Sequence, residues 1–236
     1  MIIYLLILSI IIVTVKYIYD MHQLNLSATL IQIQNPNNID KEILFKERSP
    51  AIIHNLTGKF LDLENITISN LVQNNPGYII QDNHKNILLS SFEDEKVNQI
   101  SIFNNSNMIY DFNFDKSLLE INKYLMNQLS CNLKNELSIL KGNYFITLMQ
   151  NKHNCMSFIQ LSGNSIFYIF NPKHKDEIQN KSNNEIKKWA FKINMKPGII
   201  LSLPPDWYYI YETEGESILI TSYFDNYFTW MYNLLR

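Results

Sequence analysis

The sequence predicts a mostly β protein with helices, of the α+β class, preceded by an N-terminal transmembrane helix. Three observations support this prediction. The chain begins with an apolar run, one amphipathic helix lies near its middle, and from residue 143 onward short runs rich in Ile, Phe and Tyr alternate with clusters of Gly, Pro, Asn and Lys. Such runs at such spacing are typical of antiparallel strands in a sandwich or barrel.

Length and composition bound the class of protein. The 236 residues allow one domain of ordinary size, or two small ones. A hydrophobic fraction of 46% with 18% charged residues is enough for a packed core and excludes a disordered polyelectrolyte. The net charge of -2 leaves no excess of Lys and Arg for a phosphate backbone, which excludes nucleic-acid binding. The excess of residues with AT-rich codons points to an AT-rich genome, such as that of a large DNA virus or a protist.

The first 19 residues predict a membrane anchor. Lys16 is the only charged side chain among them, and as a helix they would span about 28 Å, close to the roughly 30 Å hydrocarbon core of a bilayer. Tyr17 and Tyr19 suit the interface with water. We therefore expect a single-pass transmembrane helix at residues 1–19, with an orientation that the flanking charges do not decide. A cleaved signal peptide and a buried core helix remain alternatives.

N-glycosylation is possible if the body of the protein lies in a secretory compartment. The chain carries five Asn-X-Ser/Thr sequons, at Asn25, Asn55, Asn65, Asn104 and Asn180. Because the chain is rich in Asn, several of these sequons are expected by chance.

The remaining elements follow in order along the chain. Residues 20–44 predict a tether with a turn cluster, and residues 115–129 predict an amphipathic helix with Asp115 as its N-cap. Residues 226–236 predict a short helical segment. Expected strands cover 51–54, 78–81, 144–149, 156–161, 165–170, 189–193, 199–203, 208–212 and 217–224.

Two stretches of the β-rich half carry a family resemblance. Residues 158–172 read FIQLSGNSIFYIFNP, and residues 195–224 read MKPGIILSLPPDWYYIYETEGESILITSYF. Together they resemble the cupin-like, JmjC-related domain family over residues 45–225. The resemblance implies a double-stranded β-helix (cupin or jelly-roll) barrel, with its core at about 143–225. The motif residues that carry it are Gln160, Gly163, Pro172, Pro197, Gly198, Pro205 and Trp207.

Active members of that family are iron(II)- and 2-oxoglutarate-dependent oxygenases. The resemblance places their His-X-Asp/Glu pair at Gln150 and Lys152, their distal His at Tyr209 and their cosubstrate-binding Lys at Ser165. A protonated Lys has no lone pair to give to a metal. Every aligned chemical position is therefore replaced, which predicts a degenerate member with no catalytic residue, no metal and no cofactor.

A displaced metal site is the alternative, with His153, Cys155 and His174 as its ligands. His153 lies an odd number of residues from Gln150, so in a regular strand it would face the opposite side. The two cysteines, Cys131 and Cys155, could also form one disulfide.

The sequence thus predicts a membrane-anchored, non-catalytic binding or scaffolding module, whose partner is another protein or a second copy of the chain. Two other functions remain open. One is an active iron(II)- and 2-oxoglutarate-dependent hydroxylase or demethylase with displaced ligands. The other is a structural membrane or virion protein.

Overall fold

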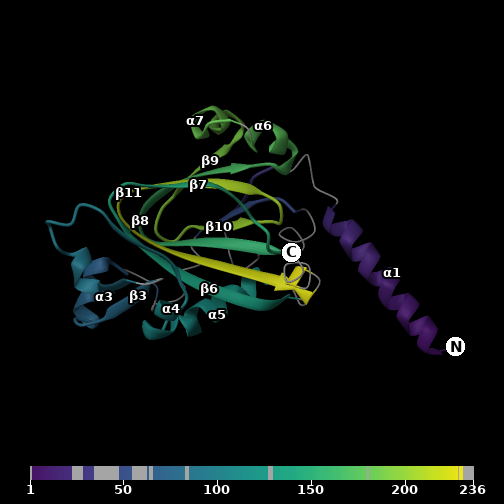
Figure 1. Ribbon diagram of the computed structural model, residues 1–236, viewed down its shortest axis with the longest axis horizontal. Helices are drawn as coiled ribbons and strands as arrows, with labels where there is room; N and C mark the ends of the chain where they lie inside the picture. Colours follow the sequence, from purple (N-terminus) through teal and green to yellow (C-terminus); the bar gives the residue numbers. More distant parts are fainter. Residues whose placement is uncertain are drawn as a thin grey trace.

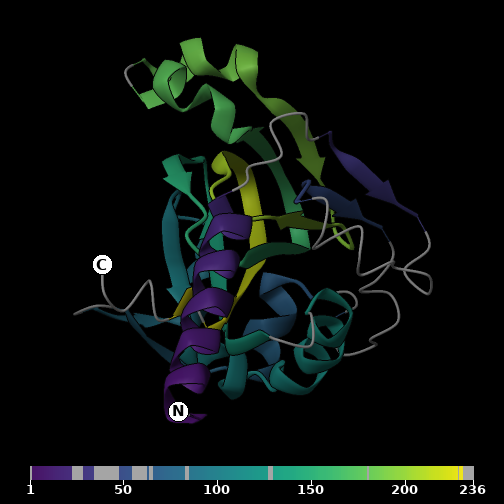
Figure 2. The same ribbon diagram turned by 90° about the vertical axis from the view of Figure 1, so that its right-hand side faces the viewer.

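The computed structural model describes residues 2–22, 29–34, 48–54, 63, 66–82, 85–126, 130–179, 181–227 and 229–230. Its main body is a barrel with helices at two ends. Figure 1 shows α6 and α7 beside β9 at one end, and α3, α4 and α5 at the other. Figure 2 shows the same separation from the side.

Nine of the described strands form one continuous sheet that folds into two halves. The strands that belong wholly to one half are β1 (Ile31–Ile33), β2 (Ala51–Ile53), β5 (Ile100–Asn105), β6 (Ser130–Lys141), β7 (Tyr144–Gln150), β9 (Phe191–Met195) and β10 (Ile200–Leu203). Two longer strands, β8 (Cys155–Phe170) and β11 (Tyr208–Asn226), pass through both halves and pair with each other along most of their length.

The strand order is that of a double-stranded β-helix. One half of the sheet reads β10, β8, β11, β6, and the other reads β9, β8, β11, β7. All five of these strand pairings are antiparallel, as in a jelly roll. The barrel begins with β6 at Ser130 rather than at the predicted residue 143. The first half of β6 is polar and partly exposed. Its sequence therefore lacks the apolar run that predicts the other strands of the barrel.

Gly163 forms the corner at which β8 passes from one half of the sheet to the other. Its φ is +72°, and a Cβ there would lie 1.9 Å from the carbonyl oxygen of Glu216. The register between β8 and β11 also shifts between Glu214 and Ile218. Only glycine fits this left-handed, crowded position.

Three buried clusters follow from the alternation of side chains along the strands. The first fills the barrel interior and includes Phe158, Phe167, Tyr209 and Tyr211. The second lies between the outer face of the half that contains β10 and β6 and three helices. These helices are α3 (Ile68–Asn74), α4 (Asn107–Asp111) and α5 (Asp115–Leu125). The third lies between the half that contains β9 and β7 and two short helices, which are α6 (Lys175–Gln179) and α7 (Asn183–Ile186). Two further strands, β3 (Ile79–Asp82) and β4 (Lys85–Leu88), form a separate hairpin.

The helix predicted at residues 115–129 is confirmed in part, whereas the structure does not test the predicted tether. The helix predicted at 115–129 is α5, which ends at Leu125 and starts after Phe114, so Asp115 is its first residue rather than its N-cap. Residues 127–129 lie outside the described part. Most of the expected tether at 20–44 and most of the segment at 226–236 also lie outside it, although β11 continues to Asn226.

The predicted transmembrane helix is wrong. Residues 2–22 form the helix α1 (Ile2–His22), but no helix in the described part of the chain is both long and apolar enough to cross a membrane. The uncharged run stops at Lys16, and the 14 helical residues from 2 to 15 reach only about 21 Å, short of the roughly 30 Å that a bilayer core requires. This finding removes the anchor at residues 1–19 from the fold class and removes the single-pass membrane localisation.

Candidate functional site

Only two of the four family positions face the barrel interior. Tyr209 packs its ring 5.0 Å from that of Phe158. Ser165 pairs with Thr213 across β8 and β11, and its hydroxyl donates a hydrogen bond to the side-chain oxygen of Gln160. Both side chains are almost fully buried.

Gln150 and Lys152 do not join them. The register between β7 and β11 shifts between Tyr209 and Tyr211, so that Gln150 pairs with Tyr208 and Met149 pairs with Tyr209. Cross-strand partners share a face, and Tyr208 packs outside the barrel in the cluster under α6 and α7. Gln150 Nε2 donates a 3.1 Å hydrogen bond to Asp206, and Lys152 is exposed. The structure therefore does not bring the four positions together.

Aromatic rings fill the barrel interior around Tyr209. The rings of Phe158 and Phe167 lie 4.8 Å apart, and Tyr211 stacks on Phe167 with centroids 4.8 Å apart and planes inclined by 17°. Burial raises the pKa of Tyr209 to about 12, so this side chain is a neutral phenol at physiological pH. Iron(II) sites of this family use imidazole and carboxylate donors with open positions beside them. The side chains present here do not fit such a site.

The position of the cosubstrate lysine is occupied by a closed polar network. Gln160 Nε2 donates to the carbonyl of Ser162 and, at 2.8 Å, to Ser217 Oγ. Ser165 completes the network through Gln160 Oε1. These groups satisfy one another and carry no charge that could pair with the carboxylate of 2-oxoglutarate.

The other motif residues shape loops and walls. Trp207 is buried in the barrel interior. Pro172 starts a 3-10 turn that Asn171 caps, and Gly198 adopts a φ of +87° in the turn before β10. The loop around Pro205 is held by the buried Asn151, whose amide donates to the carbonyls of Leu203 and Pro204. No sequence motif indicated this role of Asn151.

The three alternative metal ligands are separated from one another. His153 Nδ1 lies 3.1 Å from Asp225 Oδ2, Cys155 is buried 3.2 Å from Ser202 Oγ, and His174 lies in the turn beside Trp189. Burial raises the pKa of the Cys155 thiol to about 11. Within the described ranges, no group of three His, Cys, Asp or Glu residues is placed to hold a metal ion. Cys131 and Cys155 are both free, so the possible disulfide is absent.

A cluster of polar side chains surrounds Asp225, and no sequence motif predicted it. This carboxylate is buried, and it accepts hydrogen bonds from the Asn132 amide at 3.3 Å and the Asn154 backbone N–H at 3.2 Å. The ring of His153 also stacks on Tyr223 at 4.3 Å. Because its members are far apart in the sequence, only the fold reveals that the cluster ties the β7–β8 loop to the end of β11.

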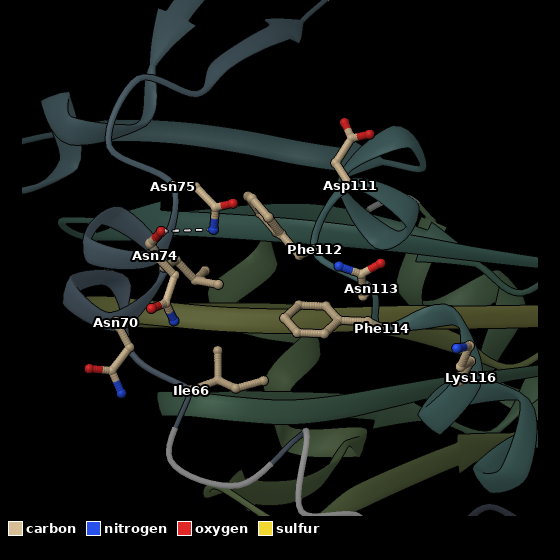
Figure 3. A pocket seen from close by; sticks show the side chains of 10 residues that line it. Ile66, Asn70, Asn74, Asn75, Asp111, Phe112, Asn113, Phe114 and Lys116 are labelled. Carbon is tan, nitrogen blue, oxygen red and sulfur yellow. Dashed lines mark hydrogen bonds between the residues drawn. The ribbon is translucent and has the colours of Figure 1, made fainter.

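A cavity of about 640 Å³ lies outside the barrel, between α3 and the segment that joins α4 to α5. Figure 3 shows its amide side chains on two sides and phenylalanine rings between them. We call it the Asn-lined cavity. Its lining consists of Ile66, Asn70, Leu71, Asn74, Asn75, Asp111, Phe112, Asn113, Phe114 and Lys116.

One of the five sequons lies in the described part of the chain. Asn104 is exposed on β5 with a φ of +52°, and its backbone N–H donates to Ser138 Oγ. Asn25, Asn55, Asn65 and Asn180 lie outside the described residues.

Comparison with solved structures finds a distant structural likeness. No protein-family model matches the chain, and no curated protein matches it. A solved cupin superfamily protein from Desulfitobacterium hafniense aligns with a TM-score of 0.30 and 10% identity, over 40% of this chain and 68% of its own. A likeness this distant establishes neither a family nor an activity, and the jelly-roll assignment follows from the strand order instead.

Proposed function

We propose that this chain is a non-catalytic, JmjC-related cupin-like domain that binds or scaffolds a partner. The strand order of a double-stranded β-helix supports the cupin-like part of this proposal. Gln160 and Gly163, which the resemblance singled out, lie at the corner of the barrel and make the contacts that shape it. The positions that would bind iron and cosubstrate carry residues with other roles.

The observation that carries the proposal is the packing of the barrel interior. Phe158, Phe167, Tyr209 and Tyr211 are each less than a tenth exposed and contact one another. A metal with an organic cosubstrate would have to displace several of these rings. Because removing one buried aromatic side chain from a core costs about 3 to 5 kcal/mol, the filled barrel strongly disfavours an oxygenase site.

Titration with 2-oxoglutarate tests the proposal. The full chain is titrated by calorimetry under anaerobic conditions with iron(II) present, and succinate release is then measured in air. We expect no saturable heat and no succinate. Saturable binding with succinate release, lost on Tyr209→Phe substitution, would instead establish an oxygenase with a rearranged barrel.

The kind of partner that the chain binds can also be measured. A scaffolding domain without a catalytic pocket acts by binding another protein or a second copy of itself. Light scattering of the purified full chain over a range of concentrations separates these two, because only self-association raises the mass in the absence of other proteins.

A further inference from the structure

We infer that the Asn-lined cavity binds an uncharged, polyhydroxylated ligand of the saccharide class. The inference goes beyond the proposed function, because it names a small-molecule ligand in addition to a protein partner and the place where that ligand sits. The cavity lies outside the barrel and uses none of the residues that the family resemblance singled out.

Two sets of polar side chains face each other across the cavity. Asn70, Asn74 and Asn75 come from α3 and its C-cap, whereas Asn113 and Lys116 come from the α4–α5 segment (Figure 3). Four side-chain amides surround one opening of about 640 Å³. The volume is within the range of small-molecule sites, about 300 to 1,000 Å³.

The local backbone holds the second set of side chains in place. Asn113 has a φ of +58°, in the left-handed region. Its N–H donates to the Tyr110 carbonyl, and the next N–H, of Phe114, donates to Ile109. This tight turn places Asn113 at the mouth of the cavity between Phe112 and Phe114. The position is therefore built by the fold rather than by a mobile surface loop.

The chemistry of the opening selects a neutral ligand with many donors and acceptors. An Asn amide has two donors and one acceptor group in one plane, and at Asn75 one of the donors already binds the Leu71 carbonyl at 3.1 Å. Asp111 and Lys116 contribute one negative and one positive charge, so the lining has no net charge. The Tyr78 hydroxyl donates to Asp111, which fixes this carboxylate. Burial, and after it this hydrogen bond, raises the pKa of Tyr78. A hydroxyl group both donates and accepts, so adjacent sugar hydroxyls match such a lining.

The floor of the cavity is apolar. Ile66, Leu71, Phe112 and Phe114 are buried beneath the amides, and Figure 3 shows the Phe114 ring pointing into the space between the two polar sides. A pyranose ring has apolar C–H faces as well as hydroxyl edges, and this combination fits an apolar floor with a polar rim. An extended peptide spreads one donor and one acceptor over each roughly 3.3 Å of chain, so it would engage fewer of the amides within this compact space.

Saccharide binding to the full chain tests the inference. Maltose, cellobiose, lactose and N,N′-diacetylchitobiose are the probes, measured by saturation-transfer NMR and calorimetry. We expect at least one to bind. The variant carrying Asn74→Ala and Asn113→Gly should weaken that binding by about tenfold, the effect of losing one or two hydrogen bonds. Glycine at residue 113 keeps the left-handed backbone.

Asn184→Ala is the matched control, because Asn184 is an exposed helical asparagine on α7, at the opposite end of the barrel. It should leave the affinity unchanged, and its circular dichroism and that of the double variant should equal that of the parent chain. No binding of any probe, binding that the double variant leaves intact, or binding of trialanine amide in place of the sugars would overturn the inference. None of these results bears on iron or 2-oxoglutarate, so failure here is distinct from failure of the proposed function.

Discussion

Tyr209 illustrates at the scale of one residue why sequence position alone does not make a site. It stands where the family resemblance places a metal-binding histidine, and it does face the barrel interior. There it packs as an aromatic core residue beside Phe158 and Tyr211. Its environment raises its pKa to about 12, with burial as the largest cause and the charge of Glu136 as the second.

This raised pKa predicts a loss of stability in alkali. An unfolded tyrosine ionises near pH 10, whereas the folded Tyr209 keeps its proton until about pH 12. Between these values the unfolded state binds fewer protons than the folded state, so the free energy of unfolding falls as pH rises, by up to about 1.4 kcal/mol per pH unit for this residue. Urea titrations across this pH range should show a shallower fall in Tyr209→Phe. Equal slopes in the two proteins would contradict the buried phenol.

The two cysteines should differ in reactivity. Cys155 is buried with a pKa raised to about 11, mainly by burial, whereas Cys131 is exposed. Desolvation and the nearby Asp225 also raise the pKa of Cys131. We therefore expect Cys131 to react in the folded chain, but more slowly than a free thiol in water. Mass spectrometry after iodoacetamide treatment should show one modified cysteine in the native chain and two in denaturant. A native Cys131→Ser variant that is still modified would contradict this assignment.

At the scale of the element, the two long strands decide the architecture. The sequence indicated their apolar runs as separate strands, because Ser162, Gly163 and Asn164 interrupt the first and the segment around Gly215 interrupts the second. The structure shows that each pair of runs is one strand that bends. The bulge in β7 could not be anticipated, because a register shift leaves no trace in the pattern of one strand. That bulge turns Gln150 away from Tyr209.

The bend in β8 predicts that replacing each of three glycines by alanine will destabilise the chain to a different degree. Gly163→Ala should destabilise the chain most, by about 3 kcal/mol or more, because the new Cβ would both clash with the Glu216 carbonyl and sit at a positive φ. Gly215→Ala meets open space but has a φ of +74°, so strain alone should cost about 1 to 2 kcal/mol.

Gly77 is the matched control for this series, since nothing lies within 4 Å of its added Cβ and its φ is not positive. Gly77→Ala should change the free energy of unfolding by less than about 0.5 kcal/mol. The order of the three denaturation midpoints is the measurement. A Gly163→Ala variant as stable as Gly77→Ala would mean that β8 does not turn at this corner.

At the scale of the whole molecule, local patterns identified the jelly roll better than they identified its sites. Spaced apolar runs and the Gln160–Gly163 motif predicted a β-barrel, and the strand order agrees with it. The anchor prediction failed because a run interrupted at Lys16 was read as long enough to span a bilayer. The Asp225 cluster and the Asn-lined cavity join residues distant in sequence, and in a chain this rich in Asn no single asparagine stands out.

The most direct test of the central claim, that the barrel does not hold a metal for oxygenase chemistry, is the iron content of the full chain. The protein is purified under anaerobic conditions with iron(II) in excess, freed of unbound metal and analysed by plasma mass spectrometry, with His153→Ala and Tyr209→Phe alongside. We predict far less iron than protein in all three samples, with no difference among them. Equimolar iron in the parent chain that disappears in either variant would contradict the account.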